Sequence, residues 1–113
     1  MAINFEAANM AGYNNPKIEV FKAHANENLE ITTAPTKSTI LGCLKRGYIP
    51  FILLTFDVEG MSYQFLCAFA GSRESAGKTN LTFTNTTSYG EAGDPQTSGL
   101  VYGPGNDSLP SVV

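Results

Sequence analysis

The sequence has few charged residues, no tryptophan, one histidine and two cysteines in 113 residues. Charged residues make up 15% of the chain, whereas a typical soluble domain carries about 25%. The seven lysines and arginines are scattered, and the formal net charge is −3. The chain therefore lacks the basic stripe that nucleic-acid binding requires. Its thinly charged surface favours a protein that buries area in an assembly.

The scarcity of histidine and cysteine limits the chemistry that the chain can perform. His24 has no second histidine for a zinc site and no nucleophile in a recognisable triad. Asp57 and Glu59 flank a predicted turn, where acidic residues are common, and do not suggest a glycosidase pair. We therefore predict a non-enzymatic protein with no catalytic residue, no metal and no cofactor. Cys43 and Cys67 are expected to be reduced and buried, with a disulfide between them as the alternative.

Long apolar runs are absent too. The longest apolar block covers residues 48–56, far fewer than the roughly 20 residues of a membrane-spanning helix. The first residues lack the basic segment and the apolar run of a secretory signal. We therefore expect no membrane partner.

One glycine-bounded stretch, Gly71–Thr79, is similar to a phosphate-binding loop. It has five residues between its two glycines, whereas a phosphate-binding loop has four and opens onto a helix. The residues that follow, 80–85, alternate as a strand does. The stretch is therefore predicted to be a loop that joins two strands.

The pattern that the sequence does contain is one short helix among several strands. Residues 17–34 alternate, with Ile18 and Val20 against charged neighbours and Phe21 out of phase, and predict a β-hairpin. Residues 35–87 predict a helix near Thr36–Gly47, followed by a three-stranded antiparallel unit. We expect an α+β, mostly β fold with one short helix packed on a small antiparallel sheet.

Both ends of the chain lack such a pattern. Residues 1–16 predict an N-terminal arm, because Ile3, Phe5 and Met10 are their only large apolar anchors. Residues 88–113 are rich in glycine, proline and serine and predict an extended C-terminal tail.

The two central strands are apolar on both faces and therefore need cover on both. The helix supplies one cover, and the second comes from the hairpin of residues 17–34 or from another subunit. Buried aromatic residues at this density favour an interface between subunits. The predicted oligomer interface consists of Phe51, Leu53, Tyr63, Phe65 and Phe69.

The chain contains, in this order, a helix ending in Lys45-Arg46-Gly47, an apolar strand, a strand with Tyr63-Gln64-Phe65 and a strand with Thr82-Phe83-Thr84. This order of elements resembles a small module of tailed-bacteriophage head-fibre and fibre-adaptor proteins. It covers residues 36–87. It implies a structural virion protein, a head-fibre or capsid-decoration subunit that is made in the host bacterial cytoplasm and is commonly a homotrimer. The resemblance further implies that the N-terminal arm, with Ile3, Phe5 and Met10, binds the major capsid protein or other virion proteins.

A small ligand- or carbohydrate-binding β module is the alternative function. In that case Tyr13, Tyr89 and Tyr102 would be exposed platforms on which sugar rings stack. The exposure of these tyrosines in the folded chain discriminates between the two functions.

Overall fold

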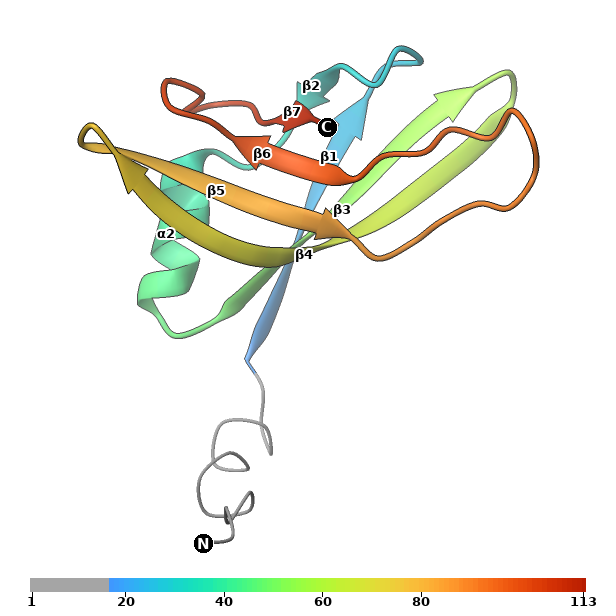
Figure 1. Cartoon of the computed structure of the whole chain (residues 1–113). Helices are drawn as coiled ribbons and strands as arrows, with labels where there is room; N and C mark the ends of the chain where they lie inside the picture. Colours follow the sequence, from blue (N-terminus) through green and yellow to red (C-terminus); the bar gives the residue numbers. More distant parts are fainter. Residues whose placement is uncertain (1–16) are drawn as a thin grey trace, which may run out of the picture.

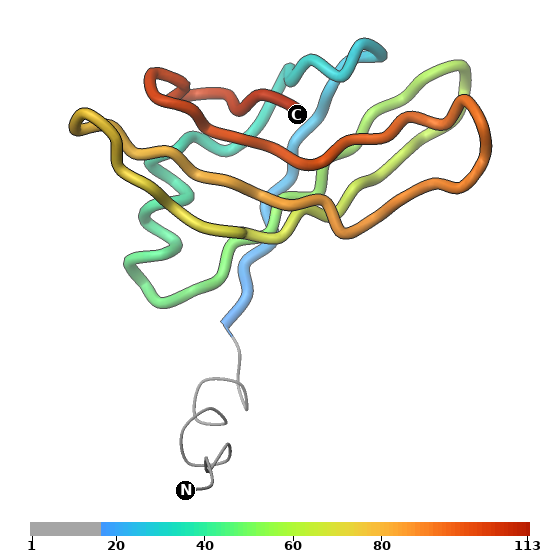
Figure 2. The backbone as a smooth tube through the Cα atoms, viewed as in Figure 1, coloured from blue at the N-terminus to red at the C-terminus, as the bar shows by residue number. Residues whose placement is uncertain are grey.

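The computed structural model describes residues 17–113, which form one curved seven-stranded β-sheet and one α-helix (Figure 1). The elements are β1 (Ile18–Ala25), β2 (Ile31–Thr33), α2 (Lys37–Lys45), β3 (Ile49–Val58), β4 (Met61–Ser75), β5 (Lys78–Asn85), β6 (Gly99–Tyr102) and β7 (Ser111–Val112). Their order in the sheet is β2-β1-β3-β4-β5-β6-β7. Figure 2 shows that the sheet curls nearly into a barrel.

The fold is mostly β with one short helix in the described range, as the sequence predicts. The prediction of a small antiparallel sheet is corrected, because the sheet has seven strands and is mixed. β1 pairs with β2 over only two positions, and its main partner is β3, to which it runs parallel. The connection from β1 to β3 passes through β2 and α2, because two parallel strands need a long crossover connection. The predicted arm of residues 1–16, with Ile3, Phe5 and Met10, lies outside the described residues.

The helix begins and ends where its capping residues predict. Thr36 is the N-cap, and its hydroxyl oxygen accepts a hydrogen bond from the backbone N–H of Thr39 at 3.2 Å. At the other end Gly47 adopts a φ of 80°, which favours glycine and stops the helix. Ile40 is fully buried on the face that packs against the sheet.

Two tight turns connect the long central strands. Glu59 and Gly60, with φ values of 51° and 78°, join β3 to β4 where the sequence predicts a turn. Ala76 and Gly77 join β4 to β5 in the same way. The loop that the sequence predicts over residues 71–79 is therefore corrected, since most of these residues continue the two strands.

The C-terminal segment is not simply an extended tail. β6 pairs with β5, β7 pairs with β6, and Leu100 and Tyr102 are fully buried. The four-residue strand begins at Gly99 and ends just before Gly103, so the glycines and prolines near it bound the strand without excluding it. This segment extends the sheet and covers part of the core.

The core lies on the inner side of the curled sheet. β1, β3, β4, β5 and β6 all contribute to it, and α2 adds Ile40. Its buried members are Ala23, Ala25, Ile40, Ile52, Leu54, Phe56, Tyr63, Phe65, Cys67, Leu81, Phe83, Leu100 and Tyr102. One continuous apolar cluster therefore stabilises the sheet from the inside.

Candidate functional site: the outer face of the sheet

The strand registers decide which side of the sheet each residue occupies. Even-numbered residues of β3 point into the core, and Ile52, Leu54 and Phe56 are buried there. Odd-numbered residues of β3 point to the other side, because side chains alternate along a strand. The even-numbered residues of β1 and β4 pair with these odd-numbered residues and share their side.

This second side carries a continuous apolar patch across three neighbouring strands. Ile18 pairs with Ile49, and Val20 pairs with Phe51. Phe51 in turn pairs with Ala68, and Leu53 pairs with Leu66. We call this patch the outer face; it consists of Ile18, Val20, Ile49, Phe51, Leu53, Leu66 and Ala68.

The outer face is exposed in the single chain. Ile18, Val20 and Ile49 keep 48%, 55% and 43% of their surface accessible. Leu53 and Phe51 are half-buried, and neither is among the residues packed against the core. Isolated exposed apolar residues are ordinary, but a contiguous patch of them marks an interaction surface.

The structure separates the five predicted interface residues. Phe51 and Leu53 lie on the outer face. Tyr63 and Phe65 lie on the opposite side, where they are buried in the core of the chain itself. Phe69 is half-buried on the core side, and its ring packs against Phe83 with 5.5 Å between centroids. The density of aromatic residues in β4 is thus explained by the interior of the chain.

Sequence reasoning missed the contribution of β1 to this surface. The alternation of Ile18 and Val20 with charged residues resembles an amphipathic strand with these two side chains inward. The structure shows the opposite phase, with Ala23 and Ala25 buried and Phe21 half-buried. The out-of-phase position of Phe21 was the available signal for this phase.

Polar residues border the outer face at the end where β2 joins the sheet. Lys22 and His24 follow Val20 along β1, and both are exposed. The Nδ1 atom of His24 lies 3.1 Å from the hydroxyl oxygen of Thr32, and its Nε2 atom lies 3.8 Å from the carboxylate of Asp57. The hydroxyl of Thr32 donates to the backbone oxygen of His24 at 3.0 Å. These contacts link β1 to β2 and β3.

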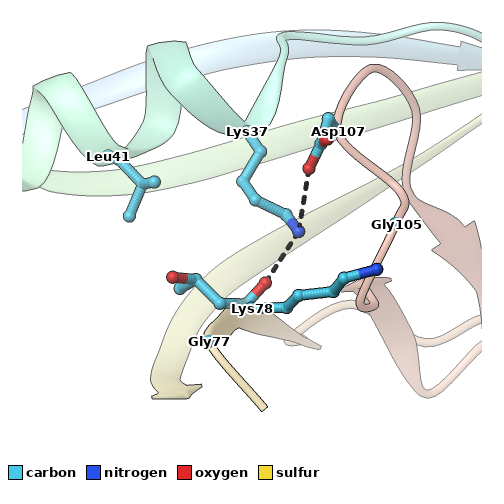
Figure 3. Close-up of a pocket in the computed structure, with 7 residues that line it drawn as sticks. Lys37, Leu41, Gly77, Lys78, Gly105 and Asp107 are labelled. Atoms are coloured by element: carbon cyan, nitrogen blue, oxygen red, sulfur yellow. Dashed lines mark hydrogen bonds and ion pairs between the residues drawn. The ribbon is translucent and has the colours of Figure 1, made fainter. Parts of the chain in front are cut away.

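A second feature is an open cavity of about 340 Å³ between the start of α2, the β4–β5 turn and the loop after β6 (Figure 3). Lys37 points into it and is only 6% exposed. Its ammonium group donates to the backbone oxygens of Thr79 at 2.7 Å and Gly103 at 2.9 Å. The carboxylate of Asp107 lies 3.3 Å from the same nitrogen.

These contacts indicate that Lys37 has a structural role. An ammonium group has three N–H donors, and three acceptors surround this one. The backbone N–H of Lys37 also donates to the backbone oxygen of Asp107 at 2.8 Å. The side chain therefore connects α2, β5 and the loop after β6, and its donors are occupied by the chain itself.

Both cysteines are buried and are not joined by a disulfide. Burial raises the pKa of the Cys67 thiol from 9.0 to about 11. Burial, followed by the nearby Glu19 carboxylate, also raises the pKa of Cys43. Both thiols therefore stay protonated at neutral pH, and a protonated thiol is a poor nucleophile and a poor metal ligand.

Two of the three tyrosines named as sugar platforms are engaged within the chain. Tyr102 is fully buried, and its hydroxyl donates to the backbone oxygen of Pro35. The ring of Tyr89 packs edge-on against Tyr63 and Phe65, with centroid distances of 5.0 and 5.4 Å. Tyr13 lies outside the described residues.

No protein-family model, curated protein or solved structure matches the chain. Within residues 17–113, no group of three or more histidine, cysteine, aspartate or glutamate side chains is arranged to hold a metal ion. The helix of this part of the chain is too short to cross a membrane.

Proposed function

We propose that the chain is a non-enzymatic structural subunit that assembles with copies of itself through the outer face. The observation that carries this proposal is the apolar patch across β1, β3 and β4. Its most exposed member, Val20, keeps 55% of its surface accessible in the single chain. Burying such surface against a partner is favourable by about 25 cal/mol for each Å² removed from water.

The composition supports a copy of the same chain as the partner. With charged residues at only 15% of the chain, little of the surface is strongly hydrated. Most soluble oligomers consist of identical subunits in closed symmetry. The resemblance of residues 36–87 to phage fibre modules supports a homotrimer.

We further propose, on that resemblance, that the assembly is a head-fibre or capsid-decoration component of a tailed-bacteriophage virion. It would be made in the host bacterial cytoplasm. Residues 1–16 would attach it to the major capsid protein or another virion protein through Ile3, Phe5 and Met10. Sequence composition supports such a contact, because all three are large apolar side chains.

Light scattering on a pair of matched variants tests the outer-face assembly. Leu53→Glu places a carboxylate in the middle of the patch, and we expect it to lower the mass to a smaller multiple of the 12.1 kDa chain. Thr82→Glu is the control, because Thr82 is an exposed polar residue of β5 and acquires the same charge. A natural chain that is already monomeric, or equal masses for the two variants, would contradict the proposal.

A further inference from the structure

We infer that the first part of β1 is a strand-addition site, and that its occupant is β1 of a second copy in antiparallel orientation. This site is the edge of the sheet and not its outer face. The inference rests on the proposed function only in taking another copy of the chain as the partner. We call residues 17–23 on the side away from β3 the β1 edge.

The β1 edge has unused backbone groups. The backbone oxygen of Lys17 accepts a hydrogen bond from the N–H of Ile49 at 2.7 Å, so this residue faces β3. Successive residues of a strand direct their N–H and C=O groups to alternate sides. Ile18, Val20 and Lys22 therefore direct theirs away from β3, and among residues 17–113 these groups have no backbone partner.

β2 limits the length of this edge. It pairs with β1 only at His24 and Ala25, next to the end of β1 (Figure 1). His24 continues the even-numbered series, which confirms that the even residues face this side. Residues 17–23 remain open, and the midpoint of that segment is Val20.

The midpoint fixes one register for a symmetric pair. In an antiparallel pair centred on Val20, this residue faces its own copy, and Ile18 faces Lys22 of the second copy. All three residues direct their backbone groups outward, so the pair would form about six main-chain hydrogen bonds. A pair centred on Phe21 would form about four hydrogen bonds. The next two would need the backbone groups of His24, which already pair with β2.

The side chains are compatible with this register. Directly opposed residues share one face of the sheet, so the outer faces of the two copies become neighbours. No like charges are opposed, because Lys22 meets Ile18, Glu19 meets Phe21 and Lys17 meets Ala23. A pair centred on Glu19 would oppose two carboxylates, and a pair centred on Lys22 would oppose two ammonium groups.

Disulfide trapping tests both the partner and the register. Val20→Cys should form a covalent dimer under mild oxidation, because opposed Cα atoms lie about 5.5 Å apart, within reach of a disulfide. Lys22→Cys should not, because its two copies would be separated by four residues along the strand, roughly 13 Å. An equal mixture of Ile18→Cys and Lys22→Cys chains should form the mixed dimer in preference to either self-dimer. The unaltered chain controls for Cys43 and Cys67.

A proline variant separates strand pairing from packing of the outer faces. Val20→Pro removes the N–H that points away from β3, at an edge position where proline is tolerated. We expect Val20→Pro to lose the antiparallel pairing of the two β1 strands and to keep the circular dichroism spectrum of the natural chain. Val20→Thr should keep both the pairing and the spectrum. If Val20→Pro retains the natural mass, or if Val20→Cys yields no more dimer than Lys22→Cys, the inference is wrong.

Disulfide formation by Val20→Cys also distinguishes this inference from the proposed function. Leu53→Glu changes the outer face and leaves the backbone of β1 intact, so the Val20→Cys dimer should still form in that background. Dimer formation with no effect of Leu53→Glu on mass would overturn the outer-face assembly and leave the edge pairing supported. Assembly that depends on Leu53 without the trapped dimer would overturn the edge pairing alone.

Discussion

Both sides of β3 are apolar over residues 49–54, yet the two sides have opposite environments. Leu54 is fully buried in the core cluster, whereas its neighbour Leu53 lies on the outer face. Hydrophobicity alone does not distinguish them. The difference arises because the sheet curls toward one side, where α2 and β6 complete the core, and leaves the other side uncovered in the single chain. A strand that is apolar on both sides needs cover on both, and the described residues cover only one side of β3.

The largest expected difference between the two sides comes from truncating these adjacent leucines. Leu54→Ala removes buried methyl groups and leaves a cavity, so we expect it to lower the free energy of unfolding by about 2–5 kcal/mol. Leu53→Ala should cost about 1 kcal/mol or less in the single chain. Urea denaturation at low protein concentration measures both, because dilution removes the contribution of assembly. Equal losses would mean that the outer face is also part of the core.

Buried and exposed lysines extend the comparison to charged groups. Lys37→Met removes the donors that satisfy the backbone oxygens of Thr79 and Gly103, and we expect a loss of roughly 1–3 kcal/mol. Lys22→Met is the matched control on the exposed outer side, with an expected change of about 0.5 kcal/mol or less. Thermal unfolding of both variants at one protein concentration reports the difference. A Lys37 variant as stable as the control would show that its three contacts contribute no net stability.

Local signals explain which parts of the fold could be predicted from the sequence. The helix was predictable because Thr36 and Gly47 cap it through contacts within a few residues. The β3–β4 hairpin was predictable because Glu59-Gly60 suits a tight turn between two apolar runs. Each of these features depends on residues that are neighbours in the sequence.

Contacts between distant residues explain what could not be predicted. The parallel pairing of β1 with β3 joins Ile18 to Ile49, and no local pattern specifies such a partner. The choice of the core side of β3 depends on that pairing, so the interface prediction combined Phe51 and Leu53 with core residues of β4. The short strand β6 was hidden by the glycines around it, although Leu100 and Tyr102 alternate as a strand requires.

The smallest expected effect is an alkaline loss of stability that originates only on the core side. Burial raises the pKa of Cys67 to about 11 and raises the pKa of Tyr102, so folding favours the protonated form of both groups. Their stabilisation is complete below the ordinary thiol pKa of 9.0 and is lost as the pH rises through the folded value. We expect Cys67 to contribute a loss of roughly 1 kcal/mol by pH 10.

Urea denaturation between pH 8 and pH 10 measures this loss, at roughly one-unit steps in pH. Cys67→Ala should flatten the decline, because the variant has no thiol to ionise, even though the cavity lowers its stability at every pH. Leu53→Ala should leave the slope unchanged, since no thiol or phenol lies on the outer face. A decline of the same slope in Cys67→Ala would exclude the Cys67 thiol as the source of the alkaline sensitivity.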